Sequence, residues 1–161
     1  MRVLQGEEEK QAKKFMEQAV NIAQQATCER SQCGSIIIKD GEPIGKGYNS
    51  PPKNLEDQRR CSCEKQSYHR KVVDKTCCMH AEQRAIMDAL IHNPQKIMGS
   101  TLYFIRLQEG IKAYAGKPYC TLCSKMALDA GIKEFVLWHK EGISAYQTEE
   151  YNTLSYQYEE E

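Results

Sequence analysis

Apolar residues recur at two different spacings along this chain of 161 residues, and each spacing predicts a different kind of element. Between residues 8 and 27 apolar side chains return at steps of three and four, which places them on one face of an α-helix. Short runs of β-branched and aromatic residues predict strands instead, and the first of these runs ends at the turn signal Asp40-Gly41. We expect strands at about 34–39, 43–48, 101–107 and 133–138, and further helices at about 78–92 and 120–130.

The order of these elements predicts the α/β class, with helices lying on the faces of a sheet. Pro94 ends the second helix and Gly131 stands just after the third, in the usual C-terminal position. A C-terminal tail from about residue 140 to residue 161 holds four tyrosines and is expected to add a short helix against the edge of the sheet. We therefore expect a single domain over residues 1–161.

Residues 49–78 show no periodicity and hold two consecutive prolines, many charges and four cysteines. A loop of this length inside a compact domain is normally functional, or is organised by something other than a hydrophobic core. We call this segment the cysteine-rich loop.

Composition excludes some classes of protein. Lysine and arginine together number 22, as do aspartate and glutamate, so the formal net charge is zero. This balance argues against a broad nucleic-acid-binding surface, although a local basic pocket is compatible with it. No apolar run is long enough to cross a bilayer and the N-terminus lacks a signal-peptide core, so we expect a cytoplasmic protein. Its eight cysteines are then more readily thiols or metal ligands than disulfides.

Two short motifs bring the candidate chemistry, and each opens a predicted helix. The first is His80-Ala81-Glu82, and the second is the pair Cys120 and Cys123. Zinc favours imidazole and thiolate ligands, and a catalytic zinc site keeps three protein ligands. We predict that His80, Cys120 and Cys123 hold Zn²⁺ and that Glu82, on the same turn as His80, is the catalytic general acid and base.

Either motif alone is compatible with a different chemistry. A Cys-x-x-Cys pair can be redox-active, but that function is typical of a thioredoxin-like βαβ start, whereas this pair follows the third strand and a long loop. The pair can also be half of a structural zinc site, but such a site needs a fourth ligand, and none is evident beside His80.

The two motifs together closely follow the zinc-deaminase order of His-x-Glu and then Pro-Cys-x-x-Cys. Over about residues 12 to 140 the sequence resembles the deoxycytidylate deaminase branch of the cytidine-deaminase-like superfamily. Residues 34–41 are similar to that branch's first strand and turn, 47–52 to its substrate loop, and 129–133 to its exit from the zinc helix. The resemblance implies a three-layer α/β/α fold with a mixed, roughly five-stranded sheet, a catalytic zinc, a small-molecule nucleotide substrate and commonly a homo-oligomer.

The resemblance also indicates substrate-binding residues. It implies that Asn49 binds sugar and base, although asparagine is also a common turn residue before proline. Ala81, Arg106 and Tyr119 are further candidates.

Three arginines are candidates to meet a 5′-phosphate, although an ordinary surface charge would account for each of them: Arg30, Arg84 and Arg106. The chain departs from the family pattern where Tyr119 separates Pro118 from the first zinc cysteine and where Arg84 replaces an asparagine. A long loop over residues 107–117 is a third departure.

The cysteine-rich loop is a candidate for a second, structural zinc, which some members of the resembled branch carry near this place. The candidate ligands are Cys61, Cys63, His69 and Cys78, with Cys77 as an alternative to Cys78. Alternatively, these cysteines are free thiols and His69 is a solvated loop residue. Cys28 and Cys33 are expected to be small buried apolar residues.

The function predicted from these observations is zinc-dependent hydrolytic deamination of a cytosine nucleotide, such as deoxycytidylate, to the uracil nucleotide and ammonia. One alternative is a deaminase that acts on a base in tRNA or single-stranded DNA. Another is a non-catalytic zinc-binding subunit of an oligomer, against which the presence of Glu82 argues.

Overall fold

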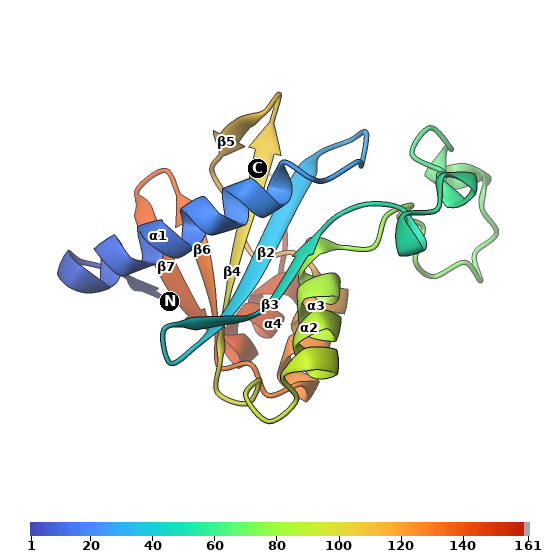
Figure 1. Ribbon diagram of the computed structural model, residues 1–161. Helices are drawn as coiled ribbons and strands as arrows, with labels where there is room; N and C mark the ends of the chain where they lie inside the picture. The colour runs from blue at the N-terminus through green and yellow to red at the C-terminus, as the bar shows by residue number, and fades with distance from the viewer. Residues whose placement is uncertain (160–161) are drawn as a thin grey trace.

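A mixed sheet of seven strands forms the centre of the molecule in a computed structural model that describes residues 1–159 (Figure 1). The strand order is β1-β7-β6-β4-β2-β3, and the short β5 pairs with β4 outside this path. Among these pairs β4 and β6 run parallel and the others are antiparallel. The strands are β1 (Arg2–Val3), β2 (Gln32–Lys39), β3 (Glu42–Tyr48), β4 (Thr101–Gln108), β5 (Ile111–Ala113), β6 (Glu134–His139) and β7 (Gly142–Gln147). The helices are α1 (Gly6–Ala23), α2 (Ala81–His92), α3 (Thr121–Asp129) and α4 (Thr148–Tyr156).

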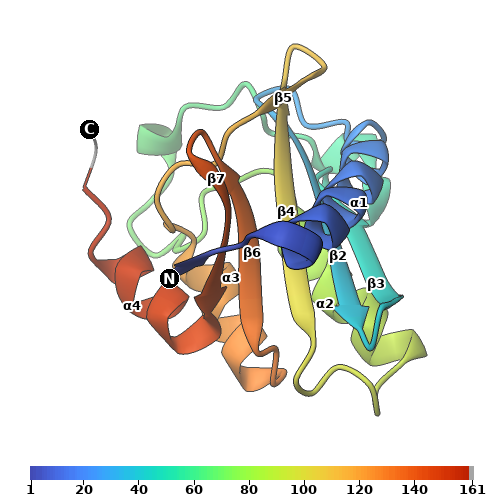
Figure 2. The ribbon, with the colours of Figure 1, turned by 90° about the vertical axis from the view of Figure 1, so that its left-hand side faces the viewer.

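Helices cover both faces of the sheet, which confirms the predicted α/β/α layers (Figures 1 and 2). On β2, Ile36 and Ile38 pack with α1, whereas Ile37 between them packs with α2 on the opposite face. Successive side chains of a strand point to opposite faces, so a strand covered on both sides is apolar at consecutive positions. The two faces therefore have two separate cores.

The sheet has more strands than the five or so expected, because three strands escape the sequence pattern: β1, β5 and β7. The residues 1–3 that precede α1 add β1 to the free edge of β7, and the loop after β4 folds back as β5. The tail after residue 140 contains β7 as well as the expected helix, and Tyr151 of α4 stacks on Phe135 with ring centroids 4.1 Å apart. Residues 160–161 of the predicted domain lie outside the described part of the chain.

Gly47 lets α2 approach β3 closely. A Cβ atom at this position would lie 2.3 Å from the carbonyl oxygen of Ala81 and 2.5 Å from the amide nitrogen of Ala85, both backbone atoms that cannot move aside independently. The first turn of α2 therefore rests directly on the backbone of the strand. This contact fixes the position of the turn that carries His80 and Glu82.

The outer edge of β3 is covered by polar side chains of α2. Asp88 Oδ2 accepts the amide hydrogen of Lys46 at 2.9 Å, and Asn93 Nδ2 donates to the carbonyl oxygen of Ile44 at 2.8 Å. Pro43, on the same strand, has no amide hydrogen to offer. The hydrogen-bonding groups of this edge are thus partly used within the chain.

The cysteine-rich loop leaves the sheet after β3 and returns at Met79, where an isolated bridge pairs it with Ser50. It forms a lobe beside the sheet with only short 3₁₀ turns (Figure 1), at Pro52–Asn54, Glu56–Gln58 and Lys65–Ser67. Most of its side chains are exposed, so a hydrophobic core does not organise it. Within residues 1–159, no helix combines the length and the apolar character that crossing a membrane would need.

Candidate active site

The two predicted zinc motifs meet at the N-termini of two neighbouring helices. His80 is the residue that caps α2, and Cys120 caps α3, where its sulfur accepts the amide hydrogen of Cys123 at 3.3 Å. His80 Nδ1 lies 3.2 Å from the sulfur of Cys120 and 3.2 Å from that of Cys123, and the two sulfurs are 2.9 Å apart. The structure therefore brings the three predicted ligands into one cluster.

These three donor atoms fit one zinc ion. Zinc binds thiolate sulfur at about 2.3 Å and imidazole nitrogen at about 2.1 Å. A triangle with sides of 2.9 to 3.2 Å is small enough for one ion to contact all three corners at such lengths.

The charges of the cluster also suit a cation. The hydrogen bond with Cys123 lowers the pKa of the Cys120 thiol to about 5, and the proximity of Cys120 raises the pKa of His80 to about 9. The lowered pKa of Cys120 favours the ionised form of its sulfur. Zinc displaces the protons of its ligands when it binds, so a site that already favours a thiolate is prepared for it.

Glu82 is the second residue of α2. Its side chain lines a pocket, and the residue is only 5% exposed. Burial, followed by the negative charge of Cys120, raises the pKa of its carboxyl to about 7. A carboxyl group with a pKa near neutrality exchanges protons readily at physiological pH, which is what a general acid and base requires.

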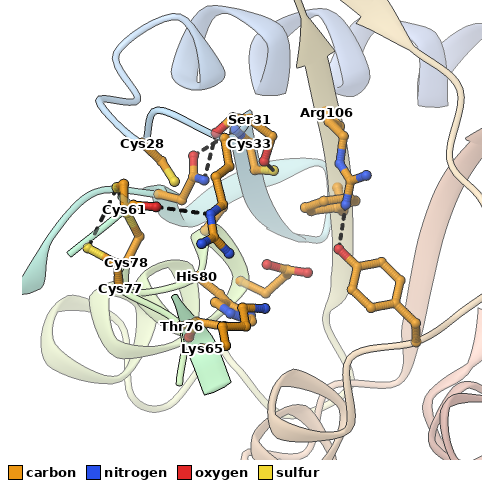
Figure 3. Close-up of a pocket in the computed structure, with 16 residues that line it drawn as sticks. Cys28, Ser31, Cys33, Cys61, Lys65, Thr76, Cys77, Cys78, His80 and Arg106 are labelled. Carbon is orange, nitrogen blue, oxygen red and sulfur yellow. Dashed lines mark hydrogen bonds between the residues drawn. The ribbon is translucent and has the colours of Figure 1, made fainter. Parts of the chain in front are cut away.

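The pocket has a volume of about 240 Å³ and lies between His80 and Glu82 on one side and the cysteine-rich loop on the other. Figure 3 shows Arg106 on one side of it and the thiols of the loop on the other. Three cationic side chains line it, Arg30, Lys65 and Arg106, whereas Glu82 is the one carboxylate among its described lining residues. The neutral net charge of the chain therefore conceals a locally positive site, which favours an anionic ligand.

Asn49 lines the pocket, but its side chain is also part of the loop structure. Its Oδ1 accepts the amide hydrogen of Cys33 at 2.7 Å, and its Nδ2 donates to the carbonyl oxygen of Ser31 at 2.9 Å. A carboxamide has two N–H groups and two oxygen lone pairs, so one of each is left for a ligand. Asn49 is thereby held in a fixed orientation.

Ala81 and Tyr119 also line the pocket, as does Arg106 of β4. Ala81 is the first residue of α2, so its amide hydrogen has no partner within the helix. Tyr119 precedes Cys120 and accepts a hydrogen bond from Nη2 of Arg106. The structure thus gathers all four predicted substrate-binding residues around one cavity.

Arg84 does not line this pocket, contrary to its interpretation as a candidate phosphate ligand. From the second turn of α2 its guanidinium donates to the carbonyl oxygen of Pro51 at 2.8 Å and to Oδ1 of Asn54 at 2.9 Å. It also stacks over Tyr48, 5.5 Å from the ring centre. Its role in the fold is to tie the start of the cysteine-rich loop, next to Asn49, to α2.

The predicted ligands of the second metal site do not all lie together. Cys61 and Cys78 lie together as expected, with their sulfurs 3.9 Å apart. The sulfur of Cys77 lies 3.6 Å from that of Cys61, so Cys77 and Cys78 are both close to Cys61 and are not alternatives. Cys28, expected to be a small buried apolar residue, joins Cys61 and Cys78 as a third possible ligand. We call Cys28, Cys61, Cys77 and Cys78 the thiol cluster.

Two of the predicted ligands lie outside the thiol cluster. Cys63 and His69 are exposed on the far part of the loop, and His69 Nδ1 instead accepts the amide hydrogen of Lys71. The chain turns away from the cluster after Cys61, so spacing along the sequence did not translate into proximity. Cys33, by contrast, is buried in the core as expected.

The chain is similar in sequence to known deaminases. A family model described as the cytidine and deoxycytidylate deaminase zinc-binding region matches residues 9–139. The deoxycytidylate deaminase of Mycobacterium phage D29 is 29% identical over 128 residues, which cover 76% of this chain and 89% of that protein. The deoxycytidylate deaminase of Schizosaccharomyces pombe is 26% identical over 125 residues, which cover 76% of this chain and 35% of that protein. The chain therefore spans about a third of that relative's length.

Solved structures show the same fold. The crystal structure of dCMP deaminase from the cyanophage S-TIM5, in complex with dCMP and dUMP, matches this chain with a TM-score of 0.54 and 26% sequence identity. The match covers 76% of each chain.

Proposed function

Because the chain belongs to the cytidine and deoxycytidylate deaminase family, we propose that it deaminates the cytosine ring of a deoxycytidylate-like nucleotide by hydrolysis. The observation that carries the proposal is that Glu82 and His80 line one small pocket with cationic side chains, while Cys120 and Cys123 lie against His80. A purely structural zinc site has no use for a buried carboxyl group beside it.

His80, Cys120 and Cys123 would hold the metal. When bound, zinc supplies a nucleophile at neutral pH, because it lowers the pKa of water to about 7. Glu82 takes the proton of the attacking water and delivers it to N3 of the ring as the oxygen adds to C4. Glu82 next takes the remaining proton of that oxygen, now a hydroxyl group on C4, and passes it to the amino group. The bond between C4 and the amino nitrogen then breaks, ammonia leaves, and C4 becomes the carbonyl carbon of uracil.

Other residues of the pocket would orient the base and the phosphate. The free amide hydrogen of Ala81 and the remaining N–H of Asn49 are donors for the ring carbonyl and the sugar. The cations Arg30 and Lys65 on one side and Arg106 on the other favour a nucleotide over an uncharged nucleoside.

A panel of substrates tests the proposed function. Purified protein, with its zinc content measured, is incubated with dCMP, CMP, deoxycytidine and cytidine, and the release of ammonia is followed. We expect deamination of at least one nucleotide, with kcat/KM about a hundredfold above that of the corresponding nucleoside, because a charged phosphate bound by paired cations contributes a few kcal/mol. Absence of ammonia from all four compounds would contradict the proposal.

Arg84 is expected to act as a positioning residue for the loop that carries Asn49. Arg84→Gln removes the forked contact with Pro51 and Asn54, so we expect KM to rise about three- to tenfold while kcat changes less than twofold. Arg84→Lys should restore little, because an ammonium group does not reproduce the fork. Steady-state kinetics on the best nucleotide measure the effect, and equal losses in kcat and kcat/KM would speak against positioning.

We also propose that the thiol cluster binds a second zinc, which braces the cysteine-rich loop. Cys28, Cys61 and Cys78 offer three sulfurs within reach of one ion, and Cys77 is the neighbouring thiol for the fourth position. The loop lacks a core of its own, so a metal would supply the stability that buried apolar side chains supply elsewhere. Arg30, which donates to the carbonyl oxygen of Cys61 at 3.2 Å, links this cluster to the catalytic pocket.

A further inference from the structure

A second cavity, of about 90 Å³, adjoins the catalytic pocket behind Tyr119. Phe104, Arg106 and Tyr119 line both cavities. The far wall comes from the loop after β4 and from the C-terminal tail. The loop after β4 departs from the family pattern, and the tail follows residues 9–139, which the family model matches. These segments contribute the side chains of Tyr114, Tyr151 and Tyr158.

The second cavity is lined by aromatic rings and is open to solvent at its rim. Tyr119 and Tyr158 pack together with ring centroids 5.9 Å apart, and Tyr114 stands near them with 55% of its surface exposed. Exposed tyrosines beside a cavity provide flat surfaces on which a nucleobase can stack, and every base has such a face.

Arg106 stands between the two cavities. Its Nη2 donates to the hydroxyl group of Tyr119, its guanidinium carbon lies 5.7 Å from the centre of that ring, and its buried Nε has no hydrogen-bond acceptor among residues 1–159. Lys117 also lines the second cavity, in which the described lining residues include no carboxylate. A phosphate group that joined two nucleosides, one in each cavity, would therefore meet a cation at its centre.

We propose that the second cavity is a subsite for the nucleotide next to the target cytidine, so that the substrate extends to a short single strand. The neighbouring base stacks on Tyr158 and Tyr114, and Arg106 binds the phosphodiester between the two nucleosides. The inference rests on the proposed deamination and names a longer substrate for the same site. The reaction on the target ring is unchanged.

The test compares dCMP with two 5′-phosphorylated dinucleotides, which carry thymidine on the 3′ or the 5′ side of deoxycytidine. We expect one dinucleotide to be deaminated with kcat/KM about tenfold above that of dCMP, since this factor lies within the usual contribution of stacking one base. Tyr158→Ala and Tyr114→Ala should each remove most of this gain and leave the kcat/KM for dCMP within about twofold. Tyr156→Ala is the matched control, because Tyr156 is exposed to 64% and lines neither cavity.

The outcomes separate the two proposals. Deamination of dCMP with no gain for either dinucleotide would overturn the second subsite and leave the proposed function intact. A gain that persists in Tyr158→Ala and Tyr114→Ala would also overturn it, because the stacking surface would lie elsewhere. If the dinucleotides and all four compounds of the first panel release no ammonia, both proposals fail together.

Discussion

Glu82→Gln is expected to lower kcat by a factor of about 10² to 10⁴, the usual contribution of a general acid and base. The substitution keeps the size of the side chain but removes its ability to take and deliver a proton. Glu82 is the only carboxylate among the described residues that line the pocket, so no neighbour can replace it. KM and zinc content should stay nearly constant, as for a group that acts only in the transition state.

The same substitution should not destabilise the protein. Burial raises the pKa of Glu82 in the folded state, so above its unfolded pKa the ionised carboxyl group works against folding. Glutamine does not ionise, and the Tm of the variant at pH 7 to 8 should equal or exceed that of the parent. Glu134→Gln is the matched control. Glu134, at the start of β6, is also buried, with 8% of its surface exposed, and it accepts a hydrogen bond from Gln147 outside the pocket. Full activity of Glu82→Gln would rule out the proposed proton transfer.

Cys61→Ser is expected to reduce zinc from two ions per chain to one and to lower Tm by about 10 °C. Zinc that exceeds its dissociation constant a thousandfold stabilises the folded state by about 4 kcal/mol, and a chain of this length loses about 2 to 4 °C per kcal/mol. The sulfur of Cys61 lies 3.6 Å from that of Cys77 and 3.9 Å from that of Cys78, so its loss should affect the whole thiol cluster. Metal analysis together with thermal unfolding measures both effects.

Two further variants give this experiment its controls. Cys63→Ser changes an exposed thiol of the same loop, outside the cluster, and should alter neither the zinc content nor Tm. Cys120→Ser should also lose one zinc ion, but with loss of activity. One zinc per chain in the unmodified protein, unchanged in Cys61→Ser, would show that the thiol cluster binds no metal.

Features that depend on local sequence were predictable. The first turns of α2 and α3 carry His80, Cys120 and Cys123 at positions where a helix start leaves amide hydrogens free, and the structure brings the three together. The apolar runs of β2 and β4 were also sufficient to predict these two strands, because strands covered on both faces are continuously apolar.

Features that depend on distant contacts were not predictable. Cys28 meets Cys61 and Cys78 because the segment between α1 and β2 lies beside the cysteine-rich loop, and no pattern near residue 28 indicates this proximity. β7 escapes the sequence pattern because Ser144 is as buried as its apolar neighbour Ile143, which hides the strand periodicity. The role of Arg84 is equally hidden, because its partners, the backbone at Pro51 and the side chain of Asn54, become visible only in three dimensions.

The covered edge of β3 bears on how copies of this chain can behave at high concentration. A bare edge strand is a template on which another chain can add a strand, and this is a common route to aggregation. Asp88, Asn93 and Pro43 remove hydrogen-bonding positions from that template. The addition of a strand from another copy to β3 is therefore disfavoured.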